Sequence, residues 1–269
     1  MLKKWNLVLD DPYKGRLKKP RSNGLTMIID KGMGLNELRD LIDMASEFID
    51  FIKFSFGTSF IYPEKILLKK INIIKDADID VYPGGTLFEV AVEQGRMADY
   101  FKSVKELGFT AVEISDGTLH INKKIRNKAI EMALAAGFKV LSEVGKKDRD
   151  NSLSLEDMQA LIKNDLNMGV YKVIVEGRES GKDISIYKKN GALDQNMLKG
   201  IIDEVEGKVE KIIWEAPLKK QQLIFLKMFG PNANFGNIHP YDIVAIEALR
   251  RGFRGDTFNY YLKEKTAGV

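Results

Sequence analysis

The chain has 269 residues, of which 44% are hydrophobic and 30% are charged, as is typical of one globular domain with a sizeable core. No apolar run reaches the roughly 18 residues that a membrane span needs, so we expect a water-soluble protein without a membrane partner. The 42 basic and 38 acidic residues give a net charge of +4, and so small an excess does not indicate a nucleic-acid partner.

The N-terminus carries the basic pair Lys3-Lys4, but Asp10 and Asp11 interrupt it before the apolar core of a signal peptide could form. The absence of cysteine excludes disulfides, thiolate metal sites and cysteine nucleophiles, and it suits a reducing compartment. We therefore expect a cytoplasmic protein.

Short β-branched runs alternate with longer helical patterns along the chain, which is typical of repeated β-α units on a parallel sheet. The runs that we expect to be strands are, in chain order, Leu25–Asp30, Phe51–Ser55, Ile79–Tyr82, Ala111–Ser115, Lys139–Glu143, Lys172–Glu176, Lys211–Glu215 and Asn232–Gly236.

The segments between these runs show helical spacing and recognisable helix ends. Thr86 with Glu89 has the spacing of a capping box, and Ser154 and Asp194 are good N-caps. Gly95 is expected to split the third helical segment in two. A last helical pattern from Ile243 to Leu249 follows the eighth strand and ends at Gly252.

Eight strands that are each followed by a helix predict an α/β fold, a parallel (β/α)8 TIM barrel. The alternative is an open doubly wound sheet. We expect one domain over residues 1–269, with an N-terminal extension at 1–20 and a C-terminal tail at 259–269.

Four consecutive predicted strands carry a glutamate at their C-terminal end: Glu113, Glu143, Glu176 and Glu215. The active site of such a barrel lies at that end of the strands. Side chains alternate between the two faces of a strand, so the apolar neighbours of these glutamates would face the helices and the glutamates the barrel mouth.

Several carboxylates in one ring repel one another unless a divalent cation or basic side chains lie among them. The sequence offers the basic residues Lys31, Lys53, Lys146, Lys147 and Arg178 after or within the first, second, fifth and sixth strands. Salt bridges around an inert rim are the alternative interpretation, but the whole set at one rim favours a functional site.

Two glycine-rich segments could bring backbone N–H groups close to an anion, as loops near the last strands of this fold often do. One contains Gly84 and Gly85, and the other contains Asn234 and Asn237. Neither has the spacing of a P-loop or a dinucleotide fingerprint, so we expect no nucleotide cofactor. His120 and His239 lack metal-pair spacing, which leaves proton transfer to lysine or carboxylate.

Several strings resemble the phosphosulfolactate synthase family over roughly residues 15 to 258. They are Gly24-Leu25-Thr26-Met27, Ile29-Asp30-Lys31-Gly32, Tyr82-Pro83-Gly84-Gly85-Thr86-Leu87-Phe88-Glu89, Glu113-Ile114-Ser115-Asp116-Gly117, Ser142-Glu143-Val144-Gly145-Lys146-Lys147, Glu176-Gly177-Arg178-Glu179-Ser180-Gly181 and Arg254-Gly255-Asp256-Thr257. The combination is far more specific than any one motif.

The resemblance implies a Mg²⁺-dependent carbon-sulfur lyase that adds sulfite to phosphoenolpyruvate and gives (2R)-2-phospho-3-sulfolactate, for coenzyme M or sulfolactate synthesis. It implies that a lysine of the pair after the fifth strand protonates an enediolate, and we favour Lys146 over Lys147. Lys53 and Arg178 would bind substrate anions, with Lys31 and the two glycine-rich segments. We rank Glu143 and Glu176 first as metal ligands, then Glu113 and Glu215, because Mg²⁺ usually takes one or two protein carboxylates.

Two alternatives stay open. One is a Schiff-base aldolase on the same barrel, with Lys53 or Lys147 forming an imine. The other is a non-catalytic protein, because plant heat-stress proteins resemble this family. We also expect the chain to form a homo-oligomer. Its expected ligands are small anions, phosphoenolpyruvate and sulfite.

Overall fold

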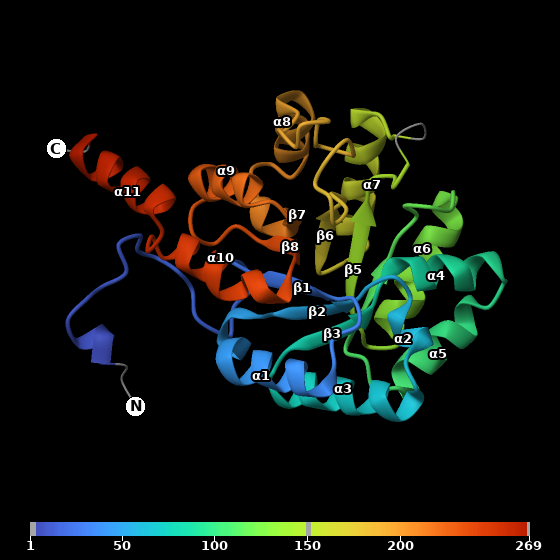
Figure 1. The fold of residues 1–269 in the computed structure, drawn as a ribbon. Coiled ribbons are helices and arrows are strands. Elements are labelled where there is room, and N and C mark those ends of the chain that lie inside the picture. The colour runs from blue at the N-terminus through green and yellow to red at the C-terminus, as the bar shows by residue number, and fades with distance from the viewer. Residues whose placement is uncertain (1–3, 149–151, 268–269) are drawn as a thin grey trace.

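The computed structural model describes residues 4–148 and 152–267. Its strands form one parallel eight-stranded sheet in the order β3-β2-β1-β8-β7-β6-β5-β4, and helices surround the sheet (Figure 1). The strands are β1 Thr26–Asp30, β2 Phe51–Phe54, β3 Asp80–Pro83, β4 Ala111–Ile114, β5 Lys139–Val144, β6 Lys172–Val175, β7 Ile212–Glu215 and β8 Phe235–Ile238.

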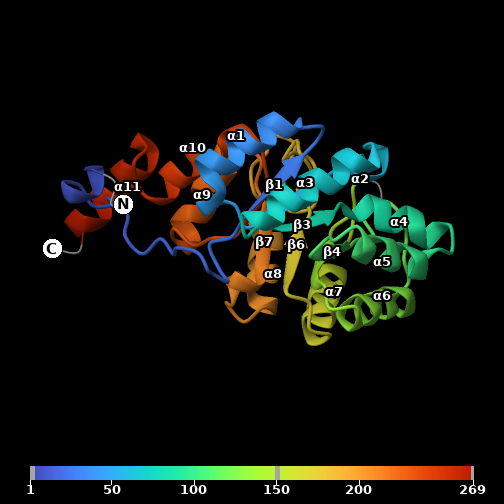
Figure 2. The same ribbon diagram turned by 90° about the horizontal axis from the view of Figure 1, so that it is seen from below.

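The α-helices follow the strands in the order that the sequence predicts, and Figure 2 shows them around the outside of the strands. They are α1 Leu35–Ala45, α2 Thr58–Ile61, α3 Glu64–Asp76, α4 Gly85–Glu93, α5 Met97–Glu106, α6 Lys123–Ala135, α7 Leu155–Asn167, α8 Gln195–Glu204, α9 Lys219–Phe229, α10 Ile243–Arg250 and α11 Gly255–Ala267. Short 3-10 turns are η1 Lys4–Leu7, η2 Ser46–Phe48, η4 Val209–Lys211 and η5 Pro240–Asp242. None of the described helices is long and apolar enough to cross a membrane.

The two ends of the strand order, β3 and β4, meet and nearly close the sheet into a barrel. Thr110, just before β4, donates its backbone N–H to the carbonyl of Val81 at 3.1 Å. Its side-chain oxygen accepts the N–H of Val81 at 2.9 Å. In an open doubly wound sheet the edge strands stay apart, so this contact confirms the predicted (β/α)8 barrel.

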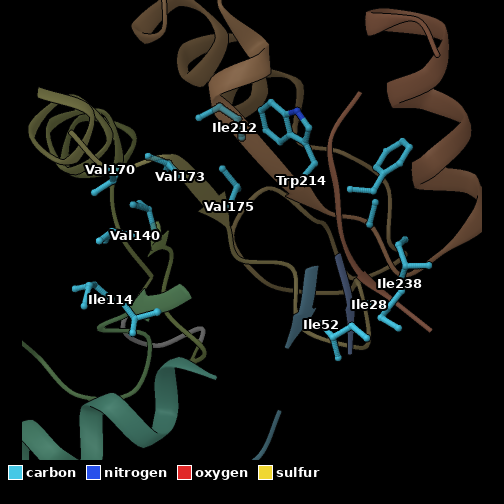
Figure 3. Close-up of a cluster of buried hydrophobic side chains, with 14 of the residues drawn as sticks. Ile28, Ile52, Ile114, Val140, Val170, Val173, Val175, Ile212, Trp214 and Ile238 are labelled. Carbon is cyan, nitrogen blue, oxygen red and sulfur yellow. The ribbon is translucent and has the colours of Figure 1, made fainter. Parts of the chain in front are cut away.

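Alternating side chains divide the apolar core into two layers. The inner layer fills the barrel with Leu25, Met27, Phe51, Tyr82, Ala111, Leu141, Ile174 and Ile213. The outer layer lies between strands and helices, where Ile114, Val175 and Trp214 contribute (Figure 3). The predicted alternation of faces is therefore confirmed, and it leaves the neighbouring glutamates on the barrel side.

Most predicted helix ends are confirmed. Ser154 and Asp194 cap α7 and α8 with their side chains, and the positive φ of Gly95 separates α4 from α5. The capping box at Thr86 and Glu89 is wrong, because α4 already begins at Gly85 with Gly84 as its N-cap.

The eighth strand was expected at Asn232–Gly236 but runs over Phe235–Ile238. Asn234 precedes it and lies at the bottom of the barrel, where the strands begin. Its Oδ1 accepts the N–H of Leu25 at 2.9 Å. Its Nδ2 donates to the carbonyls of Glu210 at 2.8 Å and Ile212 at 2.9 Å. The amide thus joins the starts of β1, β7 and β8. This structural role could not be predicted from an asparagine in a turn.

We expect Asn234→Ala to lower the free energy of unfolding by about 2–4 kcal/mol, because it leaves the buried backbone groups of Leu25 and Ile212 and the partly buried carbonyl of Glu210 without their partner. Urea denaturation checks this. Asn196→Ala at an exposed position of α8 is the control, with an expected change within about 0.5 kcal/mol. An equally small change for Asn234→Ala would contradict the assigned role.

Candidate active site

The four predicted glutamates lie together at the C-terminal rim of the barrel. Glu113 and Glu143 lie near the ends of β4 and β5, Glu176 directly follows β6, and Glu215 ends β7. All four are at most 2% exposed. Because their strands are neighbours in the sheet, their carboxylates share one poorly hydrated space, where ionised groups are costly unless they are paired.

Lys53 reaches this space from β2 on the other side of the barrel. Its Nζ lies 2.9 Å from Glu113 Oε2, 3.1 Å from Glu143 Oε2 and 3.6 Å from Glu215 Oε1. Burial opposes the charged form, but the three carboxylates outweigh it and raise the pKa of Lys53 well above its ordinary value. Lys53 is therefore a fixed cation at the centre of the ring.

Lys53 does not neutralise the whole ring. Burial and the neighbouring Glu143 raise the pKa of Glu113 to about 7. Burial, then Glu143 and Glu215, raise the pKa of Glu176 well above its ordinary value. Burial raises the pKa of Glu143 too, but the ammonium groups of Lys53 and Lys147 outweigh it and hold that pKa below its usual range. The ring thus has more carboxylates than the protein's own cations can keep ionised.

Glu143, Glu176 and Glu215 could hold a metal ion, since each offers an oxygen and these oxygens lie within 4.8 Å of one another. Oε1 of Glu176 accepts the N–H of Arg178 at 2.7 Å. Its Oε2 is buried, and no group of the described residues donates a hydrogen bond to it. An orphaned oxygen beside two carboxylates fits a hard divalent cation, which prefers oxygen ligands.

Glu113 lies apart from this group of three. It forms an ion pair with Lys53, and its Oε1 accepts the N–H of Gly85 at 2.8 Å. The two glutamates that we ranked first as metal ligands, Glu143 and Glu176, therefore lie together with Glu215. Glu113 instead forms an ion pair with Lys53.

The two lysines after β5 point in different directions. Lys147 faces the ring, with Nζ 3.6 Å from Glu143 Oε1 and 3.2 Å from Thr86 Oγ1. Lys146 binds Asp116 instead, through Oδ2 at 2.9 Å and through the backbone carbonyl. Asp116 also pairs with the buried Arg126 at 3.1 Å. Lys146, which we favoured as the acid, therefore belongs to a buried ion network beside the ring.

The other predicted binding residues are only partly brought to the rim. Arg178 is exposed and donates to the carbonyl of Lys147 at 3.2 Å. Lys31 pairs with Glu179 at 3.0 Å in an exposed position. Asn237 lies one residue before the end of β8, on the rim side, with a φ of 54°, whereas Asn234 lies at the opposite end of the barrel and cannot reach the same ligand.

Gly84 and Gly85 do not offer free amides to an anion, contrary to our expectation. The N–H of Gly84 donates to the carbonyl of Phe54 at 2.9 Å, and that of Gly85 is taken by Glu113. A Cβ on Gly85 would lie 2.4 Å from Ser115 Cβ. The glycines therefore allow α4 to approach β4 closely.

The sequence analysis missed Ser115 and Glu89 as members of the site. Ser115 Oγ lies 2.9 Å from Glu143 Oε1 and 3.0 Å from Glu89 Oε1. Ser115 has the same parity as Glu113, which could have indicated it. Glu89 is 3% exposed on α4, and its apparent capping-box spacing concealed this role.

We expect the metal-free protein to lose about 1–3 kcal/mol of unfolding free energy as the pH rises from about 4.5 to about 7. Over this range the unfolded chain releases its glutamate protons, while Glu113, whose pKa is about 7, still holds one in the folded state. Denaturation in EDTA at several pH values measures this loss.

A divalent cation should reduce that loss, because it favours the ionised carboxylates of the folded protein. Glu113→Gln is the matched variant and should also reduce it. A stability that stays flat or rises between pH 5 and 7 in EDTA would contradict the assigned electrostatics of the ring.

Known proteins resemble this chain over most of its length. A family model described as (2R)-phospho-3-sulfolactate synthase matches residues 14–256. A phosphosulfolactate synthase of Methanothermobacter thermautotrophicus is 44% identical over 244 residues, which are 90% of this chain and 94% of that protein. A phosphosulfolactate synthase of Bacillus subtilis is 39% identical over 246 residues, 90% of this chain and 95% of that protein.

More distant proteins are also similar. Protein HEAT-STRESS-ASSOCIATED 32 of Arabidopsis thaliana is 24% identical over 266 residues, 87% of this chain and 88% of that protein. N-acetylneuraminate lyase from Mycoplasma synoviae shares the fold, with a TM-score of 0.53 and 12% identity over 91% of this chain and 79% of that chain. The family model and the two synthases decide the assignment: the chain belongs to the (2R)-phospho-3-sulfolactate synthase family.

Proposed function

We propose that this protein adds sulfite to phosphoenolpyruvate and gives (2R)-2-phospho-3-sulfolactate, with a Mg²⁺ ion at the rim. The observation that carries the proposal is the group of three buried carboxylates beside the two lysines Lys53 and Lys147. Family membership supports the product. The ring itself supports a reaction in which negative charge develops on a bound acid.

Glu143, Glu176 and Glu215 would hold the cation. When bound, it supplies a Lewis acid that offsets the charge developing on the substrate carboxylate. Lys53 holds Glu113, Glu143 and Glu215 around one fixed ammonium. The ring is therefore organised before substrate arrives, as electrostatic stabilisation of a transition state requires.

The reaction forms one C–S bond and one C–H bond. The sulfur lone pair of sulfite attacks the terminal CH₂ carbon, and the π electrons of the C2–C3 double bond move toward the carboxylate. A proton is then delivered to C2, and the phosphate ester stays intact. Exposed Arg178 and Lys31 at the rim suit the binding of substrate anions.

Lys147 is the proton donor in this proposal, in place of Lys146. Burial alone would lower its pKa, but Glu143 and Glu176 outweigh burial and raise it. Lys147 is therefore protonated before the addition step. It gives its proton to C2 and regains one from solvent, which its partly exposed side chain permits.

The same charges oppose the Schiff-base alternative, because imine formation needs a neutral amine. Carboxylates raise the pKa of both Lys53 and Lys147 and so disfavour that form. The non-catalytic alternative has less support, because the chain is 44% and 39% identical to two phosphosulfolactate synthases and 24% identical to the plant heat-stress protein.

A paired substitution tests the proposal. The wild type should consume phosphoenolpyruvate only with both sulfite and Mg²⁺, as followed by phosphorus NMR. Lys147→Met should lower kcat by about 10²–10⁴-fold, the usual contribution of a positioned acid, with little change in phosphoenolpyruvate binding. Lys146→Met, which keeps the stem, should mainly lower the melting temperature because Asp116 loses a buried partner.

Three results would count against the proposal. No consumption by the wild type would return the protein to a non-catalytic role. A covalent adduct with a keto-acid after borohydride, together with activity in excess EDTA, would favour the Schiff-base alternative. Near-normal turnover of Lys147→Met would reject Lys147 as the acid.

A further inference from the structure

Glu89 is a buried carboxylate that the proposed reaction does not use. It lies on α4, outside the ring of strand-end glutamates, and is 3% exposed. Its side chain reaches the loop after β4 instead of capping its own helix. Burying a carboxylate is costly, and Glu89 does not cap a helix, so its burial needs another explanation.

The two oxygens of Glu89 have different partners. Oε2 accepts the backbone N–H groups of Thr118 at 2.8 Å and Leu119 at 2.6 Å. Oε1 accepts the hydroxyl of Ser115 at 3.0 Å and lies 3.7 Å from Lys147 Nζ. One oxygen thus anchors a loop, and the other faces the lysine ammonium.

The anchored loop also holds the backbone of Lys147, whose N–H donates to the carbonyl of Gly117 at 2.9 Å. Glu89 therefore acts on Lys147 twice, by fixing the loop that accepts its backbone N–H and by facing its ammonium. Among the described residues, Lys147 is the one cation paired with Glu89.

Glu143 is the other counter-ion of Lys147, with its Oε1 3.6 Å from Nζ, but it has further partners. It also pairs with Lys53 at 3.1 Å, and it belongs to the group of three carboxylates that could hold a metal ion. Ser115 has a single O–H to donate to either glutamate. When Glu143 is committed elsewhere, Glu89 remains to orient the ammonium.

We infer that Glu89 is a positioning residue that holds the Lys147 ammonium at the rim for proton delivery to the substrate. The inference rests on the proposed function, since it needs Lys147 as the acid. A shift of about 1 Å in a reacting group can cost on the order of 100-fold in rate, so the orientation of a long, flexible side chain matters.

The competing role is purely structural, with Glu89 needed only to anchor Thr118 and Leu119. Glu89→Gln separates the two roles. The carbonyl oxygen of glutamine can still accept both backbone N–H groups. Its NH₂ group then stands where Oε1 faced Lys147, which removes the attraction and adds a competing donor.

The experiment compares Glu89→Gln with Glu93→Gln, an exposed glutamate on the same helix. We expect Glu89→Gln to lower kcat about 10–100-fold without changing the KM for phosphoenolpyruvate or the melting temperature. The solvent deuterium isotope effect on kcat should increase, because protonation becomes slower. Crystal structures should show the ammonium displaced. Glu93→Gln should match the wild type in every respect.

A double-mutant cycle completes the test. Added to Lys147→Met, Glu89→Gln should cause no further loss of kcat, because both changes remove the same function. A loss that persists in that background and follows a lower melting temperature would overturn the inference in favour of loop anchoring, as would normal turnover of Glu89→Gln.

If the wild type does not react with sulfite and phosphoenolpyruvate, the proposed function fails independently of Glu89. The crystal structures then decide the positioning role alone. An unmoved Lys147 ammonium in Glu89→Gln would overturn it.

Discussion

The architecture of this protein depends on one electrostatic constraint, the burial of four carboxylates at a single barrel rim. Lys53 contacts three of them from the opposite side of the barrel, and Lys147 approaches from the fifth strand. Two ammonium groups do not balance four carboxylates. The pKa values of Glu113, Glu176 and Glu215 are raised as a result of that imbalance. A divalent cation held by Glu143, Glu176 and Glu215 would offset the excess negative charge.

The fold creates this constraint through close approach of neighbouring strand ends. A Cβ on Gly145 would lie 2.8 Å from Glu176 Cβ, and one on Gly177 would lie 2.5 Å from the carbonyl oxygen of Glu215. Glycine at these two positions lets β5, β6 and β7 end side by side. Their carboxylates can then meet within coordinating distance of one ion.

Much of this arrangement could be predicted from the sequence, because strand alternation and chain order are local signals. The parity of Glu113 with Ser115, or of Glu143 with Leu141, follows from a period of two residues. Lys53 could also be assigned to the barrel interior by parity. Such reasoning places residues at an end and on a face of the barrel.

Other features could not be predicted, because they depend on contacts between distant segments. The adjacent residues Lys146 and Lys147 have different partners. Lys146 lies outside the ring because it pairs with Asp116, which also binds Arg126. Asn234 was assigned to the wrong end of the barrel because a turn before a short strand shifts the strand limits by three residues or fewer. Glu89 has the spacing of a capping box with Thr86, but it binds the loop after β4 instead.

The most direct test of the account is a crystal structure of the protein soaked with Mn²⁺, a stand-in for Mg²⁺ that anomalous scattering can locate. The account predicts one ion at about 2.1 Å from oxygens of Glu143, Glu176 and Glu215, a distance typical of such hard cations, with Glu113 still paired to Lys53. An ion bound elsewhere, or a ring that stays free of metal at saturating Mn²⁺, would contradict it.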